Sequence, residues 1–321
     1  MAVNREMGKK KGFADYIIER RLKEGDLDKE PLMVIDRLGR ELGLWRALQR
    51  ELEEMYSAEG RPGYPPLTLF KCLLIELLYG ISDIELERHL RWNFLFLKFV
   101  GLSLNDPVPD HSTLSVFRKR LAEKKPKLLD SAFDFVKAQL AKRGLALRKG
   151  VIVDATIVPA SKDSSGAEEG RKGTGYKLHL AADEETLLAV RVELSSARPH
   201  DVNFILELVP PGAKRVLADK AYDSEEVRET LRKLGIKPNI MRRETPNLPN
   251  ISKFWNRVWG RARLKIEAVF AILKNNLGLG WCRWKREGGF ETQALLAVIL
   301  WNLLRGYRLL RGRASPKGSL A

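Results

Sequence analysis

Apolar residues in the first part of the chain recur every three or four positions, which is the spacing of a helix that buries one face. The clearest run predicts a helix that begins after Pro66 and ends near Gly80, with apolar positions at Phe70, Leu73, Leu74, Leu77 and Leu78. The pattern stays helical to about residue 144. We therefore expect an all-helical domain over residues 1–144.

Two short helices within this domain have recognisable start signals. Ser82 and Glu85 have the spacing of a capping box, in which each side chain bonds the backbone of the other residue at a helix start. Either Asp110 or Ser112 is expected to cap a later helix, over residues 113–124. Two short capped helices in this order are compatible with a helix-turn-helix-like unit.

The period changes from helix to strand at about residue 149. Residues 151–158 form a nearly continuous apolar run, which is typical of a buried central strand. Two alternating runs, 176–182 and 187–194, follow a polar loop at 161–175 and predict a hairpin. The remaining elements are expected to be a helix over about 201–208, a strand over 215–218, a helix over 224–234, a strand over 236–240 and two long helices over about 254–277 and 291–311. This order predicts a mixed α/β sheet with a late helical layer, over residues 145–321.

Three acidic residues stand at distinct places in this pattern. Asp154 interrupts the buried strand, Asp219 directly follows the strand 215–218, and Glu267 lies within the first long helix. An aspartate at a strand end is more commonly a turn or capping residue. Asp154, however, lies inside its run, where a carboxylate without a partner or a metal would be costly. Ligands gather beyond the ends of strands in open α/β sheets, which favours Asp219.

Two neighbouring features compete with this interpretation. Asp223 stands three residues before Glu226 at a predicted helix start, so we expect it to be an N-cap that is not needed for catalysis. Glu267 shares a helix face with Arg263 and Lys274, and a solvated ladder of ion pairs is the alternative role for all three. The adjoining face is apolar and would hold Glu267 rigidly beside the sheet.

Two aspartates on strands and a glutamate on a helix suit a site for two divalent metal ions. Mg²⁺ prefers oxygen ligands and keeps positions open for substrate phosphate. Two such ions can activate an attacking oxygen and stabilise a leaving oxygen in phosphodiester cleavage. We therefore expect Asp154, Asp219 and Glu267 to be catalytic and to bind two Mg²⁺ ions, with Mn²⁺ as a substitute.

The charge of the chain favours a polyanionic partner. Its 57 lysines and arginines exceed its 41 acidic residues and give a formal net charge of +16. The pI is near 9.8. Nucleic acid is therefore the expected partner, and a basic protein whose charge only aids solubility is the alternative.

Basic residues are dense between residues 241 and 265, where Phe254, Trp255 and Trp259 are interleaved with them. Cations hold phosphates and aromatic faces stack on distorted bases, so we expect a DNA-contacting insert over about 241–262. The alternative is a solvated helix with core tryptophans. The expected DNA-binding residues are Arg242, Arg243, Lys253, Arg257, Arg261, Arg263 and Lys274.

Other chemistries find no support in the sequence. Cys72 and Cys282 lie far apart without metal-ligand spacing and are expected to be reduced thiols. The four histidines are scattered, and only His179, in the predicted hairpin, is considered for the active site. No phosphate-cradling GxxxxGK segment occurs, so no nucleotide cofactor is expected. No apolar stretch reaches the length of a membrane span, and we expect no membrane partner and a cytoplasmic location.

Short motifs are distributed along nearly the whole chain. They are residues 66–71, 83–87 and 110–118 in the helical part, 153–156, 175–179 and 218–224 in the α/β part, and Arg263, Glu267 and Lys274 in the long helix. Together they resemble the motifs of DDE-type insertion-sequence transposases, most closely the insertion-sequence 5 group. Two positions depart from the related pattern, since Gly260 stands where tyrosine is usual and Ala221 where glycine is common. Neither departure affects the three acids.

The resemblance implies a ribonuclease H-like catalytic domain that follows a helical DNA-binding domain. It implies a transposase that binds the terminal inverted repeats of its insertion sequence, cleaves phosphodiester bonds at the element ends and joins the 3′-OH to target DNA. The implied partners are double-stranded DNA and a second copy of the chain, as a homodimer on paired ends in the nucleoid of a prokaryotic cell. Two alternatives stay open: a non-catalytic DNA-binding regulator derived from a transposase, and a ribonuclease H-like nuclease without strand transfer.

Overall fold

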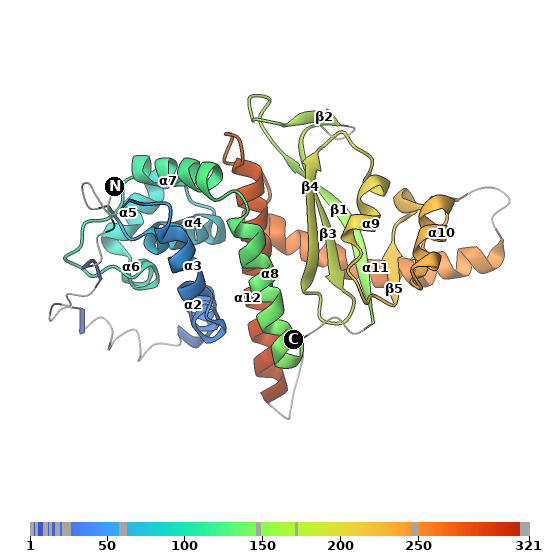
Figure 1. Cartoon of the computed structure of the whole chain (residues 1–321), viewed down its shortest axis with the longest axis horizontal. Helices are drawn as coiled ribbons and strands as arrows, with labels where there is room; N and C mark the ends of the chain where they lie inside the picture. The colour runs from blue at the N-terminus through green and yellow to red at the C-terminus, as the bar shows by residue number, and fades with distance from the viewer. Residues whose placement is uncertain are drawn as a thin grey trace. The chain divides into compact units, whose positions relative to one another are not determined.

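A computed structural model of the chain describes residues 27–57, 63–145, 149–170, 173–244 and 249–314, with a few isolated positions before residue 27. Parts of the predicted helical segment, of the loop 161–175 and of the basic insert 241–262 therefore lie outside the described residues. The chain divides into two compact units (Figure 1). The first contains residues 1–136 and 276–278, and the second contains residues 137–275 and 279–321.

The described part of the first unit is helical, as the apolar periodicity predicts. Helix α4 is its centre, because eleven of its fourteen residues, among them every position from Thr68 to Leu77, are buried and it packs against α3, α5, α6 and α7. The helices are α2 (Pro31–Leu42), α3 (Leu44–Glu53), α4 (Pro66–Tyr79), α5 (Asp83–Trp92), α6 (Phe94–Val100), α7 (His111–Lys124) and the first part of α8 (Leu128–Leu140).

Both predicted helix starts are present in this unit. Ser82 Oγ accepts a hydrogen bond from the Glu85 N–H at 3.3 Å, and the Ser82 N–H donates to Glu85 Oε2 at 2.7 Å, so the capping box of α5 is confirmed. Asp110, and not Ser112, caps α7 by accepting from the Thr113 N–H at 2.6 Å. The sequence therefore sets the boundaries of these helices through local side-chain bonds.

A six-stranded sheet forms the middle of the second unit, in the order β2-β3-β1-β5-β6 with β4 paired to β3. β1 pairs antiparallel with β3 and parallel with β5, and β5 pairs parallel with β6. The strands are β1 (Gly150–Pro159), β2 (Glu168–Gly170), β3 (Gly173–Asp183), β4 (Ala189–Ser196), β5 (Arg215–Ala218) and β6 (Lys237–Ile240). A meander followed by parallel strands is the ribonuclease H-like arrangement, so the predicted fold class is confirmed.

The two faces of β1 serve different purposes. Val151 and Val153 belong to a buried core with residues of α9 (Ile205–Leu208) and α10 (Glu225–Lys233). Ile152 and Asp154 point to the other face, because side chains alternate along a strand. The long helix α11 (Asn250–Asn276) lies on that face, behind the sheet in Figure 1. The alternation thus aims the aspartate at α11 while its neighbours anchor the strand.

The last helix, α12 (Gly289–Ala314), is tied to the hairpin of β3 and β4. Asn302 is fully buried and its side-chain amide bonds both the N–H and the C=O of Ala189, at 2.8 and 2.9 Å. Trp301 Nε1 donates to the Leu187 carbonyl at 2.8 Å. α12 therefore holds the edge of the sheet that carries no acidic residue of the predicted site. Among the described helices, none is both long enough and apolar enough to cross a bilayer.

Three predicted elements differ in detail from the structure. The polar segment 161–175 contains the short strand β2 and the start of β3. The helix expected over 201–208 is a 3-10 turn (Asp201–Phe204) followed by the single helical turn α9. α11 begins at Asn250, four residues before the predicted start, so most of the described basic segment is helical.

Candidate active site

The three predicted acids converge on one arginine. Arg263 Nη1 lies 2.7 Å from Asp154 Oδ2 and 3.9 Å from Asp219 Oδ2, and Arg263 Nη2 lies 2.6 Å from Glu267 Oε1. Residues more than 100 positions apart in the chain therefore share one cation. We call Asp154, Asp219 and Glu267 the acidic cluster.

Strand register explains why the two aspartates are neighbours. Val153 of β1 pairs with Ala218 of β5 in the parallel part of the sheet. Asp154 and Asp219 each follow these paired residues directly, so they lie side by side at the point where β5 ends. Asp219 also accepts from the Lys220 N–H at 2.6 Å, which starts a 3-10 turn and ends the strand.

Helix periodicity explains the third acid. Arg263 and Glu267 are one turn apart on α11, so their side chains lie on the same face. The other face of this part of the helix is buried through Ile266, Val269, Phe270 and Leu273. This packing holds Arg263 and Glu267 beside the middle of β1, where Asp154 lies. Arg263 and Glu267 do form the ion pair that their spacing along the helix suggests. Arg263 also contacts Asp154 and Asp219, so this pair is not a separate ladder on the helix surface.

The acidic cluster carries more negative than positive charge. Burial raises the pKa of Asp154 to about 6, although the nearby Arg263 guanidinium opposes this rise. Burial lowers the pKa of Arg263, but the three carboxylates outweigh it and leave that pKa raised. One guanidinium faces three carboxylates, so the cluster retains the electrostatic capacity to take up a further cation.

The donor set fits a hard divalent cation. All three acidic side chains offer oxygen atoms, the ligands that Mg²⁺ prefers. Within the described residues no three acidic, histidine or cysteine side chains are arranged to hold a metal directly, and in the acidic cluster the Arg263 guanidinium takes the central place. Arg263 Nε is buried without a hydrogen-bond partner among the described residues. The guanidinium is thus incompletely bonded where it lies.

Asp223 does not cap α10, so that prediction was wrong. Ser224 occupies the cap position, and no side chain bonds the helix start there. Asp223 Oδ1 instead accepts from Arg228 Nε at 2.9 Å and from Arg228 Nη2 at 2.7 Å. The Arg228 side chain is 4% exposed, and the Asp223 carboxylate is the ion-pair partner of this buried guanidinium.

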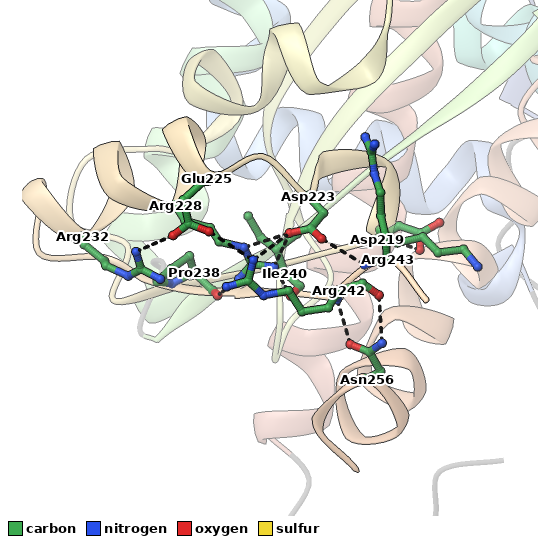
Figure 2. Close-up of polar contacts among 11 residues, drawn as sticks. Asp219, Asp223, Glu225, Arg228, Arg232, Pro238, Ile240, Arg242, Arg243 and Asn256 are labelled. Carbon is green, nitrogen blue, oxygen red and sulfur yellow. Dashed lines mark hydrogen bonds and ion pairs between the residues drawn. The ribbon is translucent and has the colours of Figure 1, made fainter. Parts of the chain in front are cut away.

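The Arg228 contacts extend to β6 and α11 (Figure 2). Arg228 also donates to the carbonyls of Pro238 and Ile240, at 3.3 and 2.8 Å. Asn256 of α11 bonds both the N–H and the C=O of Arg242, at 2.8 and 2.9 Å. We call Asp223, Arg228, Arg242 and Asn256 the Asp223 network; it ties the segment after Asp219 to the helix that carries Glu267.

The predicted DNA-binding residues occupy different surroundings. Arg242 is ion-paired with Glu225 at 3.1 Å and with Asp223 at 3.5 Å. The side chains that are exposed to solvent are Arg243, Lys253, Arg257 and Arg261. Arg263 lies in the acidic cluster, and Lys274 is partly exposed near the end of α11.

The aromatic residues of the insert are not core residues. Phe254 is 52% exposed and Trp255 is 42% exposed. Trp255 stacks on Trp259 with ring centroids 5.7 Å apart, and it meets the Phe254 ring at 5.4 Å. The interpretation of a solvated helix with core tryptophans is therefore wrong for Trp255. The first half of α11 presents an aromatic and basic surface.

His179 lies on the face of the sheet opposite to Asp154, because it pairs with Ala155, the next residue of β1. It is fully buried, stacks on Phe204 at 4.1 Å and bonds Ser195 Oγ through Nε2 at 3.0 Å. Burial lowers its pKa to about 4. It is therefore a neutral core residue. The structurally important residue that the sequence reasoning missed is Arg228, whose only sequence signal is an arginine on the apolar face of α10.

Two family models match the chain. The "Transposase DDE domain" matches residues 146–303, and the "Transposase domain (DUF772)" matches residues 19–120. The first match contains all three acids of the acidic cluster, and the second contains α5 and the capped start of α7.

Among solved structures, the chain is similar to the piggyBac transposase in a cryo-EM synaptic complex with hairpin DNA. The TM-score is 0.51 at 11% sequence identity, and the similarity covers 90% of this chain and 77% of that chain. At this identity the likeness concerns the fold. The two transposase models match separate segments that together make up most of the sequence, so the chain is similar to DDE-type transposases over most of its length.

Proposed function

We propose that this protein is a DDE-type transposase that binds the terminal inverted repeats of an insertion sequence of the insertion-sequence 5 group, cleaves the element ends and joins the freed 3′-OH to target DNA. The observation that carries this proposal is the convergence of Asp154, Asp219 and Glu267 on one shared cation. An excess of carboxylate oxygen at a strand edge suits chemistry on a phosphodiester, provided that divalent cations offset the negative charge.

Each residue of the acidic cluster has a proposed role. Asp154 and Asp219, on adjacent strands, would ligate both metal ions, and Glu267 would complete the second site. Bound Mg²⁺, or Mn²⁺ in its place, supplies Lewis acidity for in-line displacement at phosphorus. Arg263 would leave its central position and turn to a phosphate beside the scissile bond. In the first reaction water attacks phosphorus and the 3′ oxygen leaves as a 3′-OH. In the second reaction this hydroxyl attacks a target phosphodiester, its oxygen bonds to the target phosphorus, and the target's own 3′ oxygen leaves as a new 3′-OH.

DNA contacts are proposed for both parts of the chain. The helical domain, residues 1–144, would recognise the element ends through α5 and α7 in a helix-turn-helix-like manner. The insert over about 241–262 would hold DNA near the acidic cluster through Arg242, Arg243, Lys253, Arg257 and Arg261, with Lys274 further along α11. Lysine and arginine contacts to phosphates supply affinity and position the duplex. A homodimer on two paired ends is the proposed assembly.

Cleavage of end-containing DNA tests the proposal. The substrate is a duplex from the DNA flanking the reading frame, labelled on each strand, with Mg²⁺ and with chelator. The expected result is a metal-dependent nick at the element end and, with target plasmid, a joined product. Glu267→Gln is the matched control, since it keeps the shape of the side chain and removes its charge. Binding without nicking would favour the regulator, and nicking without joined product would favour the nuclease.

A further inference from the structure

Tyr222 is a fully buried tyrosine whose hydroxyl makes no hydrogen bond to any described residue. It ends the 3-10 turn η4 (Lys220–Tyr222), which begins directly after Asp219. A buried phenol normally bonds a partner, because an unpaired hydroxyl has lost its contacts with water and gained none in the protein. The unpaired hydroxyl therefore destabilises the fold at a residue only three positions after an acid of the acidic cluster.

Two contacts place Tyr222 beside the acidic cluster. Its N–H donates to the Asp219 carbonyl at 3.0 Å, so one tight turn joins the two residues and brings their Cα atoms within about 7 Å of each other. Its side chain belongs to the buried core that contains Val153 and Ala218. These two residues directly precede Asp154 and Asp219. The phenol ring therefore packs against the strand residues next to both aspartates.

The Tyr222 hydroxyl lies in the electric field of several carboxylates. Burial raises the pKa of Tyr222, and the negative charges of Asp154, Asp201 and Asp219 raise it further. The Arg263 guanidinium opposes this rise. The phenol is therefore held in its protonated form, in which it can donate a hydrogen bond. It is a donor without an acceptor, close to groups that accept.

Among these carboxylates, Asp219 has an oxygen atom to offer. Asp219 Oδ1 accepts a backbone N–H, whereas Oδ2 has only the 3.9 Å ion pair with Arg263 among the described residues. The Asp154 carboxylate already accepts a hydrogen bond at each oxygen. Asp201 accepts from Lys177 at 2.8 Å. Asp219 Oδ2 is thus the acceptor that a modest side-chain rotation can bring to the phenol.

We propose that Tyr222 is a positioning residue of the acidic cluster, whose hydroxyl donates to the Asp219 carboxylate when a divalent cation takes the place of Arg263. In the metal-free chain Arg263 draws this carboxylate toward α11 and leaves the hydroxyl unpaired. Once the guanidinium leaves, the new hydrogen bond fixes the orientation of Asp219 toward the cation. The inference rests on the proposed function, because it requires a divalent cation at the acidic cluster.

This role gives Tyr222→Phe two opposite effects. In chelator the substitution removes a buried hydroxyl that has no partner, so the melting temperature should rise, by about 2 °C. With Mg²⁺ the variant lacks a hydrogen bond to a charged group, so its apparent affinity for Mg²⁺ should fall about tenfold. A tyrosine that only fills the core would not combine a gain in stability with a loss in metal affinity.

Thermal unfolding of the full chain without DNA, over a series of Mg²⁺ concentrations, measures both quantities. Tyr176→Phe is the matched control, because Tyr176 is a buried tyrosine of the same unit whose hydroxyl donates to the Ser165 carbonyl. It should lower the melting temperature in chelator and leave the Mg²⁺ affinity unchanged. In cleavage of end-containing DNA, Tyr222→Phe should need about tenfold more Mg²⁺ for half-maximal nicking, and Tyr176→Phe should need no more than the wild-type chain.

Two results would overturn the inference and leave the proposed function standing. If Tyr222→Phe binds Mg²⁺ as tightly as the wild-type chain, the hydroxyl does not position Asp219. If Tyr222→Phe is less stable than the wild-type chain in chelator, the hydroxyl already has a partner before the cation binds. A wild-type chain that Mg²⁺ neither stabilises nor activates for nicking would instead contradict the proposed function, and the role of Tyr222 would fail with it.

Discussion

The acidic cluster and the Asp223 network contain two aspartates only four residues apart in the chain, Asp219 and Asp223, yet these carboxylates have opposite electrostatic surroundings. In the acidic cluster one guanidinium serves three carboxylates, and its Nε has no partner among the described residues. In the Asp223 network one carboxylate faces two guanidinium groups, and buried Arg228 also reaches two backbone carbonyls.

This difference distinguishes a group of residues suited to catalysis from one that stabilises the fold. A cluster that is short of positive charge is costly to leave alone, and it gains stability when a cation binds. A network whose one carboxylate already faces two guanidinium groups and is hydrogen-bonded gains nothing from an added cation, but it loses stability when the carboxylate is removed. The same residue types therefore predict different mutant behaviour in the two places.

The largest expected effect is on cleavage, in the acidic cluster. Asp154→Asn and Glu267→Gln should each lower the cleavage rate by roughly 10³-fold, equivalent to about 4 kcal/mol of transition-state stabilisation. Their free energy of unfolding in chelator should change little, because each substitution also relieves repulsion between carboxylates. Strand-nicking rates and urea denaturation measure the two quantities. If a variant is less stable but still nicks at the wild-type rate, the substituted residue does not take part in catalysis.

The next effect is on stability, in the Asp223 network. Asp223→Ala should lower the free energy of unfolding by about 3–5 kcal/mol, because it leaves the Arg228 charge buried and unpaired. Urea denaturation gives this value. Glu225→Ala is the control, since the exposed pairs of Glu225 with Arg232 and Arg242 are screened by solvent and should contribute much less to stability. Equal losses in the two variants would show that burial does not govern this network.

A smaller effect concerns the response to divalent cations. Removing the guanidinium in Arg263→Ala leaves three carboxylates without a cation, so 10 Kd of Mg²⁺ should stabilise this variant by about 1.4 kcal/mol. The wild-type chain should respond less, because Mg²⁺ must first displace Arg263. Thermal unfolding with Mg²⁺ and with chelator measures both responses. The Arg228→Ala variant should show no such gain, and a similar gain there would contradict the comparison.

The smallest effect separates two arginines in DNA binding. Arg257 is exposed and has no ion pair among the described residues, whereas Arg242 is paired with Glu225 and Asp223. Arg257→Ala should therefore flatten the slope of log affinity against log salt by about 0.9, the value of one phosphate contact. Arg242→Ala should change that slope less. Binding titrations at several salt concentrations measure the two slopes. Equal slopes in the two variants would contradict the expected difference between Arg257 and Arg242.

The sequence predicted the elements whose boundaries are set locally. Strand β5 matches the expected residues 215–218, and the Ser82–Glu85 capping box marks the start of α5. It also identified the three acids that the fold brings together, because each one breaks or follows a distinct apolar pattern. Local patterns were sufficient for features that depend only on residues close together in the sequence.

The remaining features depend on contacts that are distant in sequence. Asp223 has the local spacing of a helix cap, but a buried arginine and the end of β6 use its carboxylate instead. Arg263 shows only a pair with Glu267 along the helix, and its contact with Asp154 spans 109 positions. β2 has three residues and exists only through pairing with β3. No pattern within a short window could reveal these three.

The most direct test of the account is metal-dependent cleavage of end-containing DNA by Asp219→Asn and Asp223→Asn, measured side by side at a temperature where both variants are folded. These substitutions remove one negative charge each, four residues apart, with the same change in shape. The account predicts that Asp219→Asn makes no nick at the element end, while folded Asp223→Asn nicks at a rate close to that of the wild-type chain. Equal loss in both variants, or full activity in Asp219→Asn, would contradict the assignment of the acidic cluster as the active site.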